Sequence, residues 1–314
     1  MNENTIIDEI LNDVKKKDQE YIFKNRFDFT NKSIIKWRQN ANFAKKILDE
    51  NKINYCLFKG YDIPHAIMDD VDILIEDELV LKGLLSKLKE DKFIFKHIPF
   101  NDELKVSAID KKTKIEIDFY PDAKWGELRY ERKGVISKNT TYDLKHGINF
   151  PVPIPEYEIY IVATHSYYHG RINLLEILNT IKILQEKKPS LERIIKTSKS
   201  FHMQNAVLSL LSISDKVMNI YGTEGVEKTN INELKKISNS RFSNISEKFS
   251  SLDQLPWKFS LSDIVLSSLD KFGAKNLDVN AKKSDELAGF VKHNRISNFF
   301  YSKFSKKYNE YSPV

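Results

Sequence analysis

The N-terminal fifty residues repeat apolar side chains every three or four positions, which predicts two helices. We expect the first helix over residues 5–24, with Thr5 as its N-cap. The second is expected over residues 33–50, where Trp37 and Leu48 lie on the apolar face. Both helices precede any segment with the two-residue period of a strand.

Short apolar segments follow and predict a sheet. Extended segments are expected at residues 55–58, 71–75, 93–99, 104–109 and 114–120. A helix at 79–90 separates the second segment from the third, and residues 110–113 read as a hairpin turn. Strand, helix, strand and hairpin together predict an α+β fold, a small mixed sheet with helices packed on one face.

Three closely spaced prolines, Pro151, Pro153 and Pro155, indicate a boundary, and the pattern beyond them is helical. Helices are expected at 155–169, 174–186, 191–198, 202–220, 231–238, 261–272 and 285–304. We therefore predict an N-terminal helical extension (1–36), a sheet-containing domain (37–150) and an all-helical C-terminal domain (151–314).

Composition narrows the class of protein. The chain is 41% hydrophobic and 30% charged, which is typical of globular proteins, and we expect no membrane-spanning helix. Its one cysteine, Cys56, excludes an intramolecular disulfide and a cysteine-based zinc site, and burial in an apolar strand argues against catalysis by its thiol. With a polar N-terminus unlike a signal peptide, this predicts a cytoplasmic location. The net charge of +6 permits an anionic partner without requiring one.

Candidate chemistry begins with Asp70 and Asp72, which lie at positions i and i+2 of one predicted strand. Side chains two apart on a strand point to the same face, so the two carboxylates would repel each other. A divalent cation with a preference for oxygen ligands, Mg²⁺ above all, would relieve that repulsion.

The predicted strand at 114–120 alternates apolar and polar residues and supplies a third carboxylate, Asp118, with Glu116 as the alternative on the same face. Beside Asp70 and Asp72, it would complete a cluster able to hold two Mg²⁺ ions, or Mn²⁺ in their place. The third carboxylate could also accept a proton from an incoming hydroxyl.

Before this cluster, the strand at 55–58 ends on Lys59 and Gly60. A glycine backbone can approach a triphosphate closely, and a lysine can add a positive charge to the same phosphates. Together with the carboxylates, this predicts a site for a nucleotide.

These residues carry a resemblance. A Lys-Gly pair, nine intervening residues, Asp-apolar-Asp and a later apolar-Asp-apolar strand resemble the DNA polymerase β-like nucleotidyltransferase superfamily. Within it, they are most similar to a poorly characterised nucleotidyltransferase-like family with Lys-Gly before the metal motif. The resemblance covers roughly residues 37–185. It implies metal binding by Asp70, Asp72 and Asp118, and phosphate contact at Gly60.

The resemblance implies Mg²⁺-dependent transfer of a nucleoside monophosphate from an NTP, ATP by default, to a hydroxyl, with release of pyrophosphate. The acceptor could be RNA, a small molecule or a protein, because a fold does not fix the acceptor. Tyr61 stands where the superfamily usually has a second small residue after the glycine. That departure keeps an alternative open, a catalytically silent nucleotide- or RNA-binding protein, or an antitoxin-like interaction protein of the same fold.

Three further residues are weaker candidates. His165 and His169 share a helix face, and either they line the core or cleft or one of them contacts nucleotide or substrate. Arg171 is a phosphate candidate with surface exposure as its alternative. Residues 292–308 interleave basic and aromatic side chains, a pattern that suits either single-stranded nucleic acid or an amphipathic terminal helix.

Overall fold

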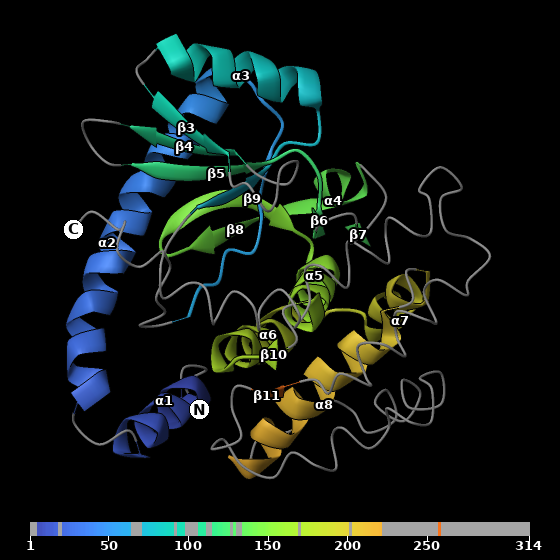
Figure 1. The fold of residues 1–314 in the computed structure, drawn as a ribbon. Coiled ribbons are helices and arrows are strands. Elements are labelled where there is room, and N and C mark those ends of the chain that lie inside the picture. The colour runs from blue at the N-terminus through green and yellow to red at the C-terminus, as the bar shows by residue number, and fades with distance from the viewer. Residues whose placement is uncertain are drawn as a thin grey trace, which may run out of the picture.

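A computed structural model describes residues 5–17, 21–63, 71–90, 93–97, 106–110, 115–125, 128–129, 134–168, 171–200, 203–221 and 257–258. The fold of this part is α+β, a small mixed sheet with helices on both sides (Figure 1). None of its helices has the length and apolar character needed to cross a membrane. The helices predicted at 231–238, 261–272 and 285–304, and the segment 292–308, lie outside the described residues.

The central sheet has five strands in the order β1-β2-β5-β4-β3. They are β1 (Cys56–Leu57), β2 (Asp72–Leu74), β3 (Phe93–His97), β4 (Val106–Asp110) and β5 (Glu116–Tyr120). Strands β2 and β5 pair in parallel and all other neighbours pair antiparallel, so the predicted mixed sheet is confirmed. Each strand lies within or overlaps one of the five extended segments that the apolar pattern predicts.

Two helices cover one face of this sheet, α2 (Tyr21–Glu50) and α3 (Glu78–Glu90). Trp37 and Leu48 of α2 are buried against strand residues such as Ile117 and Phe119. Helix α2 begins well before the predicted start at residue 33, because neither glycine nor proline interrupts it. The predicted boundary at residue 36 therefore falls inside a continuous helix.

A hairpin that the sequence analysis missed extends this packing. It consists of β8 (Thr140–Lys145) and β9 (Ile148–Pro153), and its two-residue turn has positive φ at His146 (48°) and Gly147 (81°), as a tight hairpin turn requires. Strand β9 buries Phe150 in the core beneath α2. The boundary predicted at residue 150 lies inside β9, whose prolines occupy strand positions instead of a linker.

The remaining elements lie on the opposite side of the sheet (Figure 1). They are α1 (Thr5–Lys17), α4 (Val135–Lys138), α5 (Pro155–Tyr168), α6 (Leu174–Lys187), α7 (Leu191–Ser200) and α8 (Gln204–Ile220), with the short strand pairs β6 (Lys124–Trp125)–β7 (Leu128–Arg129) and β10 (Arg171–Ile172)–β11 (Trp257–Lys258). Helices α5 to α8 match four predicted helices within about two residues at each end. The short strand pairs were not predicted, because two-residue strands leave no periodic pattern.

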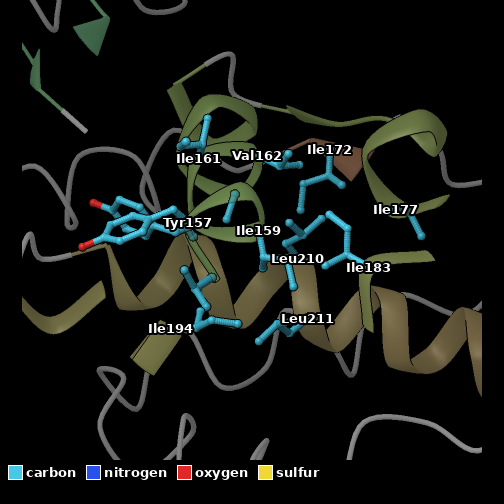
Figure 2. Close-up of a cluster of buried hydrophobic side chains, with 14 of the residues drawn as sticks. Tyr157, Ile159, Ile161, Val162, Ile172, Ile177, Ile183, Ile194, Leu210 and Leu211 are labelled. Atoms are coloured by element: carbon cyan, nitrogen blue, oxygen red, sulfur yellow. The ribbon is translucent and has the colours of Figure 1, made fainter. Parts of the chain in front are cut away.

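Isoleucine and leucine side chains from α5 to α8 meet in one buried core (Figure 2). Ile159 of α5, Ile194 of α7 and Leu210 of α8 are each completely buried. The same cluster continues to the sheet through Leu74 and Tyr120. Sheet and helices therefore share a core, and this fixes the sheet face that carries these two residues against α5.

A buried ion pair joins the β8–β9 hairpin to α5. Lys145 Nζ lies 2.9 Å from Glu158 Oε1 and 3.5 Å from Asp143 Oδ2, and the Lys145 side chain is 5% exposed. Burial by itself would lower the pKa of Lys145, but the neighbouring carboxylates outweigh it and raise the pKa. The lysine therefore remains charged, and the attraction between Lys145 and Glu158 offsets the hydration that each charge loses on burial.

We expect Lys145→Met to lower the free energy of unfolding by about 3–5 kcal/mol, because Glu158 would keep a buried charge without its cation. Urea denaturation at pH 7 measures the change. The double variant Lys145→Met/Glu158→Leu removes both charges and should regain most of the loss. A single variant as stable as the wild type would contradict this role of the pair.

Candidate active site at the start of strand β2

Strand register brings two carboxylates together. Asp72 of β2 lies directly opposite Asp118 of β5 in the parallel pair, and the Asp118 backbone N–H donates to Val71 O at 2.9 Å. Neighbouring strands are about 4.8 Å apart and register partners point to the same face. The strand of Asp118 therefore lies beside the strand of Asp72, which is the condition that the predicted carboxylate cluster requires.

The sheet face that carries these carboxylates is the one that packs on the core of helices α5 to α8, opposite α2 and α3. Leu74 and Tyr120 lie two residues beyond Asp72 and Asp118 on the same strands, and both belong to the core shared with α5. The intervening residues, Ile73 and Phe119, pack on the other face under α2. The alternation predicted for the strand at 114–120 is therefore observed.

Ser107 holds the Asp118 carboxylate in place. Its hydroxyl donates to Asp118 Oδ1 from the opposite position on β4, and both side chains are buried. A buried carboxylate held in this way presents a fixed orientation toward the helical side. The sequence analysis missed Ser107, since only the β4–β5 register identifies its partner.

Lys59 lies against the other carboxylate. Its Nζ is 3.1 Å from Asp72 Oδ2 and donates to the Tyr120 hydroxyl at 3.4 Å, and the Lys59 and Asp72 side chains are each 12% exposed. The ammonium also lies 5.3 Å and 4.9 Å from the ring centroids of Phe58 and Tyr120. The sequence led us to expect Lys59 at phosphates, and in this structure its partner is Asp72.

The register of β1 explains this position. Leu57 pairs with Ile73, and the Phe58 backbone N–H donates to Asp72 O at 2.8 Å, so residue 59 leaves the strand beside Asp72. Lys59 itself has φ 60°, in the left-handed region that costs a non-glycine residue about 1 kcal/mol. Lys59 adopts this left-handed backbone conformation at the same residue whose side chain pairs with Asp72.

Packing accounts for Gly60 in this structure. A Cβ built on Gly60 would lie 2.5 Å from Cδ2 of the buried Leu57, so a larger side chain there displaces part of the core. Tyr61, which follows, is partly buried against the core shared with α5. Packing by itself therefore requires a small residue at this position.

A cluster of charged groups holds the loop at Asp62. Lys182 Nζ of α6 donates to both Asp62 O and Asp62 Oδ2 at 2.8 Å, and the His146 backbone N–H donates to Asp62 Oδ1 at 2.8 Å. Arg38 of α2 in turn donates to His146 O at 2.7 Å. Three elements far apart in the sequence thus fix the loop two residues after Gly60.

Sequence reasoning missed this cluster, because an aspartate after Gly-Tyr reads as an ordinary loop residue. Burial by itself would raise the pKa of Asp62, but the hydrogen bonds from Lys182 and His146 outweigh it and hold the pKa below its usual range. Asp62 is therefore charged at neutral pH and bound on both carboxylate oxygens.

Other predicted residues lie elsewhere or outside the described part. Asp70 and His169 are among the residues that the structure does not describe. Glu116, the alternative third carboxylate, is half-buried on β5 two residues before Asp118. His165 is half-buried near the C-terminal end of α5.

Arg171 is exposed on β10, beside α6 and away from the central sheet (Figure 1). Its charge acts on Glu176, whose pKa burial raises to about 7. No contact found among the described residues joins Arg171 to Asp72 or Asp118.

The described residues contain no group of three or more His, Cys, Asp or Glu side chains placed to hold a metal ion. Asp72 and Asp118 form a pair there, and the third predicted ligand, Asp70, lies outside this part. Comparisons of the chain with family models, curated proteins and solved structures found no match. Function is therefore inferred from the chemistry of the site.

We expect Asp62→Asn to lower the free energy of unfolding by about 1.5–3 kcal/mol at pH 7, because the charged hydrogen bonds to Lys182 and His146 weaken. A lowered carboxylate pKa stabilises the fold above the unfolded value of about 4, and this contribution is lost as the pH falls through the folded pKa. The difference between variant and wild type should therefore shrink at pH 3 in urea denaturation. The exposed Asp8→Asn is the control, and a difference independent of pH would contradict the role of the Asp62 charge.

Proposed function

We propose that the protein is a Mg²⁺-dependent nucleotidyltransferase, in which the five-stranded sheet with α2 and α3 forms a polymerase β-like domain and a mainly helical region follows it. The observation that carries the proposal is the pairing of Asp72 with Asp118 on the sheet face that meets the helices. The Lys59–Gly60 turn ends next to this pair. Carboxylates can hold the metal ions that bind the phosphates of an NTP, and backbone N–H groups of a glycine-containing turn can bind the pyrophosphate that leaves.

The donor set fits Mg²⁺, and Mn²⁺ as its substitute. Asp72 and Asp118 offer hard oxygen ligands on one face, and we propose Asp70 as the third ligand, with Glu116 as the alternative. When bound, the metal would neutralise phosphate charge and make the acceptor hydroxyl more acidic. Two adjacent carboxylates with a single lysine beside them favour an additional cation.

The residues of the chain then take distinct roles. Asp118, oriented by Ser107, would accept the proton of the acceptor hydroxyl. That oxygen forms a bond to the α-phosphorus of the NTP as the bond to pyrophosphate breaks. Lys59 and the backbone at Gly60 and Tyr61 would hold the β- and γ-phosphates.

The NTP is ATP by default, and the acceptor is RNA, a small molecule or a protein. We propose His165 on α5 as a further nucleotide contact, since α5 packs against the sheet face of the carboxylates. Arg171 is proposed as a contact for a more distant part of a long acceptor, because it is exposed on β10 beside α6.

One observation favours a second candidate function. The Lys59 ammonium already lies at Asp72, and Tyr61 follows Gly60 where the superfamily usually has a small residue. A protein that kept the fold for binding alone would tolerate a lysine at the metal site. The alternative is therefore a catalytically silent nucleotide- or RNA-binding protein, or an antitoxin-like partner of another protein.

We expect the full-length protein with Mg²⁺ to release pyrophosphate from at least one NTP when total RNA or cell lysate supplies the acceptor. Asp72→Asn and Asp118→Asn should each lower this rate at least about a hundredfold, since each removes a transition-state contact worth several kcal/mol. A coupled pyrophosphate assay measures the rate, and α-labelled NTPs on a denaturing gel identify the acceptor.

Glu116→Gln is the matched control on the same strand, and it should keep most of the activity if Asp118 is the third carboxylate. Unchanged pyrophosphate release in Asp72→Asn would exclude the proposed site. Mg²⁺-dependent nucleotide binding without pyrophosphate release from any of the four NTPs would support the silent sensor. Nucleotide binding without Mg²⁺ dependence, together with a stoichiometric protein partner, would support the antitoxin-like alternative.

A further inference from the structure

The Lys59 ammonium lies at a carboxylate that the proposed function assigns to metal binding, Asp72. Its Nζ lies 3.1 Å from Asp72 Oδ2 in a setting where both side chains are only 12% exposed. Water therefore screens the pair weakly, and the attraction is stronger than in a surface ion pair. A divalent cation approaching this oxygen competes with the lysine.

Two aromatic rings hold the ammonium in addition. Nζ lies 4.9 Å from the Tyr120 ring centroid and 5.3 Å from that of Phe58, and it donates to the Tyr120 hydroxyl at 3.4 Å. Cation–π contacts in partly desolvated sites stabilise a cation further. Lys59 is thus placed by carboxylate, hydroxyl and rings together.

The same lysine also lies next to the turn that is proposed to hold phosphates. It directly precedes Gly60, and the loop beyond is fixed at Asp62 by Lys182 and His146, so the backbone of the turn has a defined place. A lysine side chain has a flexible stem and can turn from one anion to another. Triphosphate at this turn would offer the ammonium a new partner.

We propose that Lys59 is a displaceable counter-ion that occupies the cation position at Asp72 and lowers the affinity of the site for free divalent metal. Resting on the proposed function, this adds regulation to the same site. Metal binding expels the ammonium from Asp72, and the ammonium then points toward nucleotide phosphates. A ligand that takes up the expelled lysine raises metal affinity, and metal raises the affinity for that ligand by the same factor.

The test measures Mn²⁺ binding to the full-length protein by electron paramagnetic resonance, with no nucleotide and no turnover. Lys59→Gln should bind Mn²⁺ at least about tenfold more tightly than the wild type, because one competing positive charge is removed. Lys59→Arg keeps the charge and should bind Mn²⁺ as weakly as the wild type. Lys46→Gln, which removes a lysine that is 71% exposed on α2, is the control for net charge.

A measurement on the unaltered chain keeps the proposal testable even where a variant fails to fold. The rate at which an amine-selective reagent modifies Lys59, measured by mass spectrometry, reports whether the ammonium is bound to Asp72. Saturating Mg²⁺ should raise the modification rate of Lys59 severalfold while leaving that of Lys46 unchanged. Asp72→Asn should raise the Lys59 rate without any metal.

Mn²⁺ binding to the two variants separates the counter-ion role of Lys59 from the metal site itself. Equal Mn²⁺ affinity in Lys59→Gln and wild type, with binding abolished in Asp72→Asn, would overturn the counter-ion role and leave the metal site standing. Mn²⁺ binding unaffected by Asp72→Asn would overturn both. A Lys59 modification rate that does not respond to saturating Mg²⁺ would also overturn the counter-ion role.

Discussion

Asp72 and Asp118 stand next to each other because β2 and β5 pair in parallel, and this pairing is the constraint around which the site is built. Two carboxylates in adjacent register positions on a largely buried face repel each other, so compensating groups must lie close by. The structure supplies them from two directions, the Ser107 hydroxyl at Asp118 and the Lys59 ammonium at Asp72. Ser107 lies on β4 and Lys59 follows the end of β1 by two residues, and these are the two strands adjacent to the parallel pair.

Two charged pairs, one half-buried and one buried, also connect the rest of the fold to this site. Lys182 of α6 and the β8–β9 turn hold Asp62, and Lys145 of that same hairpin pairs with Glu158 of α5. The Asp62–Lys182 pair joins residues 120 positions apart, whereas Lys145 and Glu158 are 13 positions apart and join the hairpin to the helix that follows it. The β8–β9 hairpin therefore contacts both the loop after Lys59 and helix α5. We expect the loss of either ion pair to change the positions of the groups at the site.

The Lys59 side chain beside the carboxylate pair is either a permanent partner of Asp72 or one that a ligand can displace. As a permanent partner of Asp72, Lys59 would make the site stable but catalytically silent. As a displaceable partner, Lys59 would lower the affinity of the carboxylates for free divalent cations until a phosphate ligand binds. The two readings differ in one physical quantity, the free energy needed to move the ammonium from Asp72, which the aromatic rings of Phe58 and Tyr120 increase.

The sequence by itself determined the five strands of the central sheet, the helices from α3 to α8 apart from short α4, and the alternation that places Asp118 and Tyr120 on one face, because these follow from local period and propensity. It could not determine which strands are neighbours, since pairing depends on long-range contacts that leave no local pattern. The partners of Asp118, Asp72 and Asp62, namely Ser107, Lys59 and Lys182, follow from those contacts alone. The β8–β9 hairpin escaped prediction for a related reason: its prolines resemble a boundary in the sequence, and only packing against α2 gives them a place in a strand.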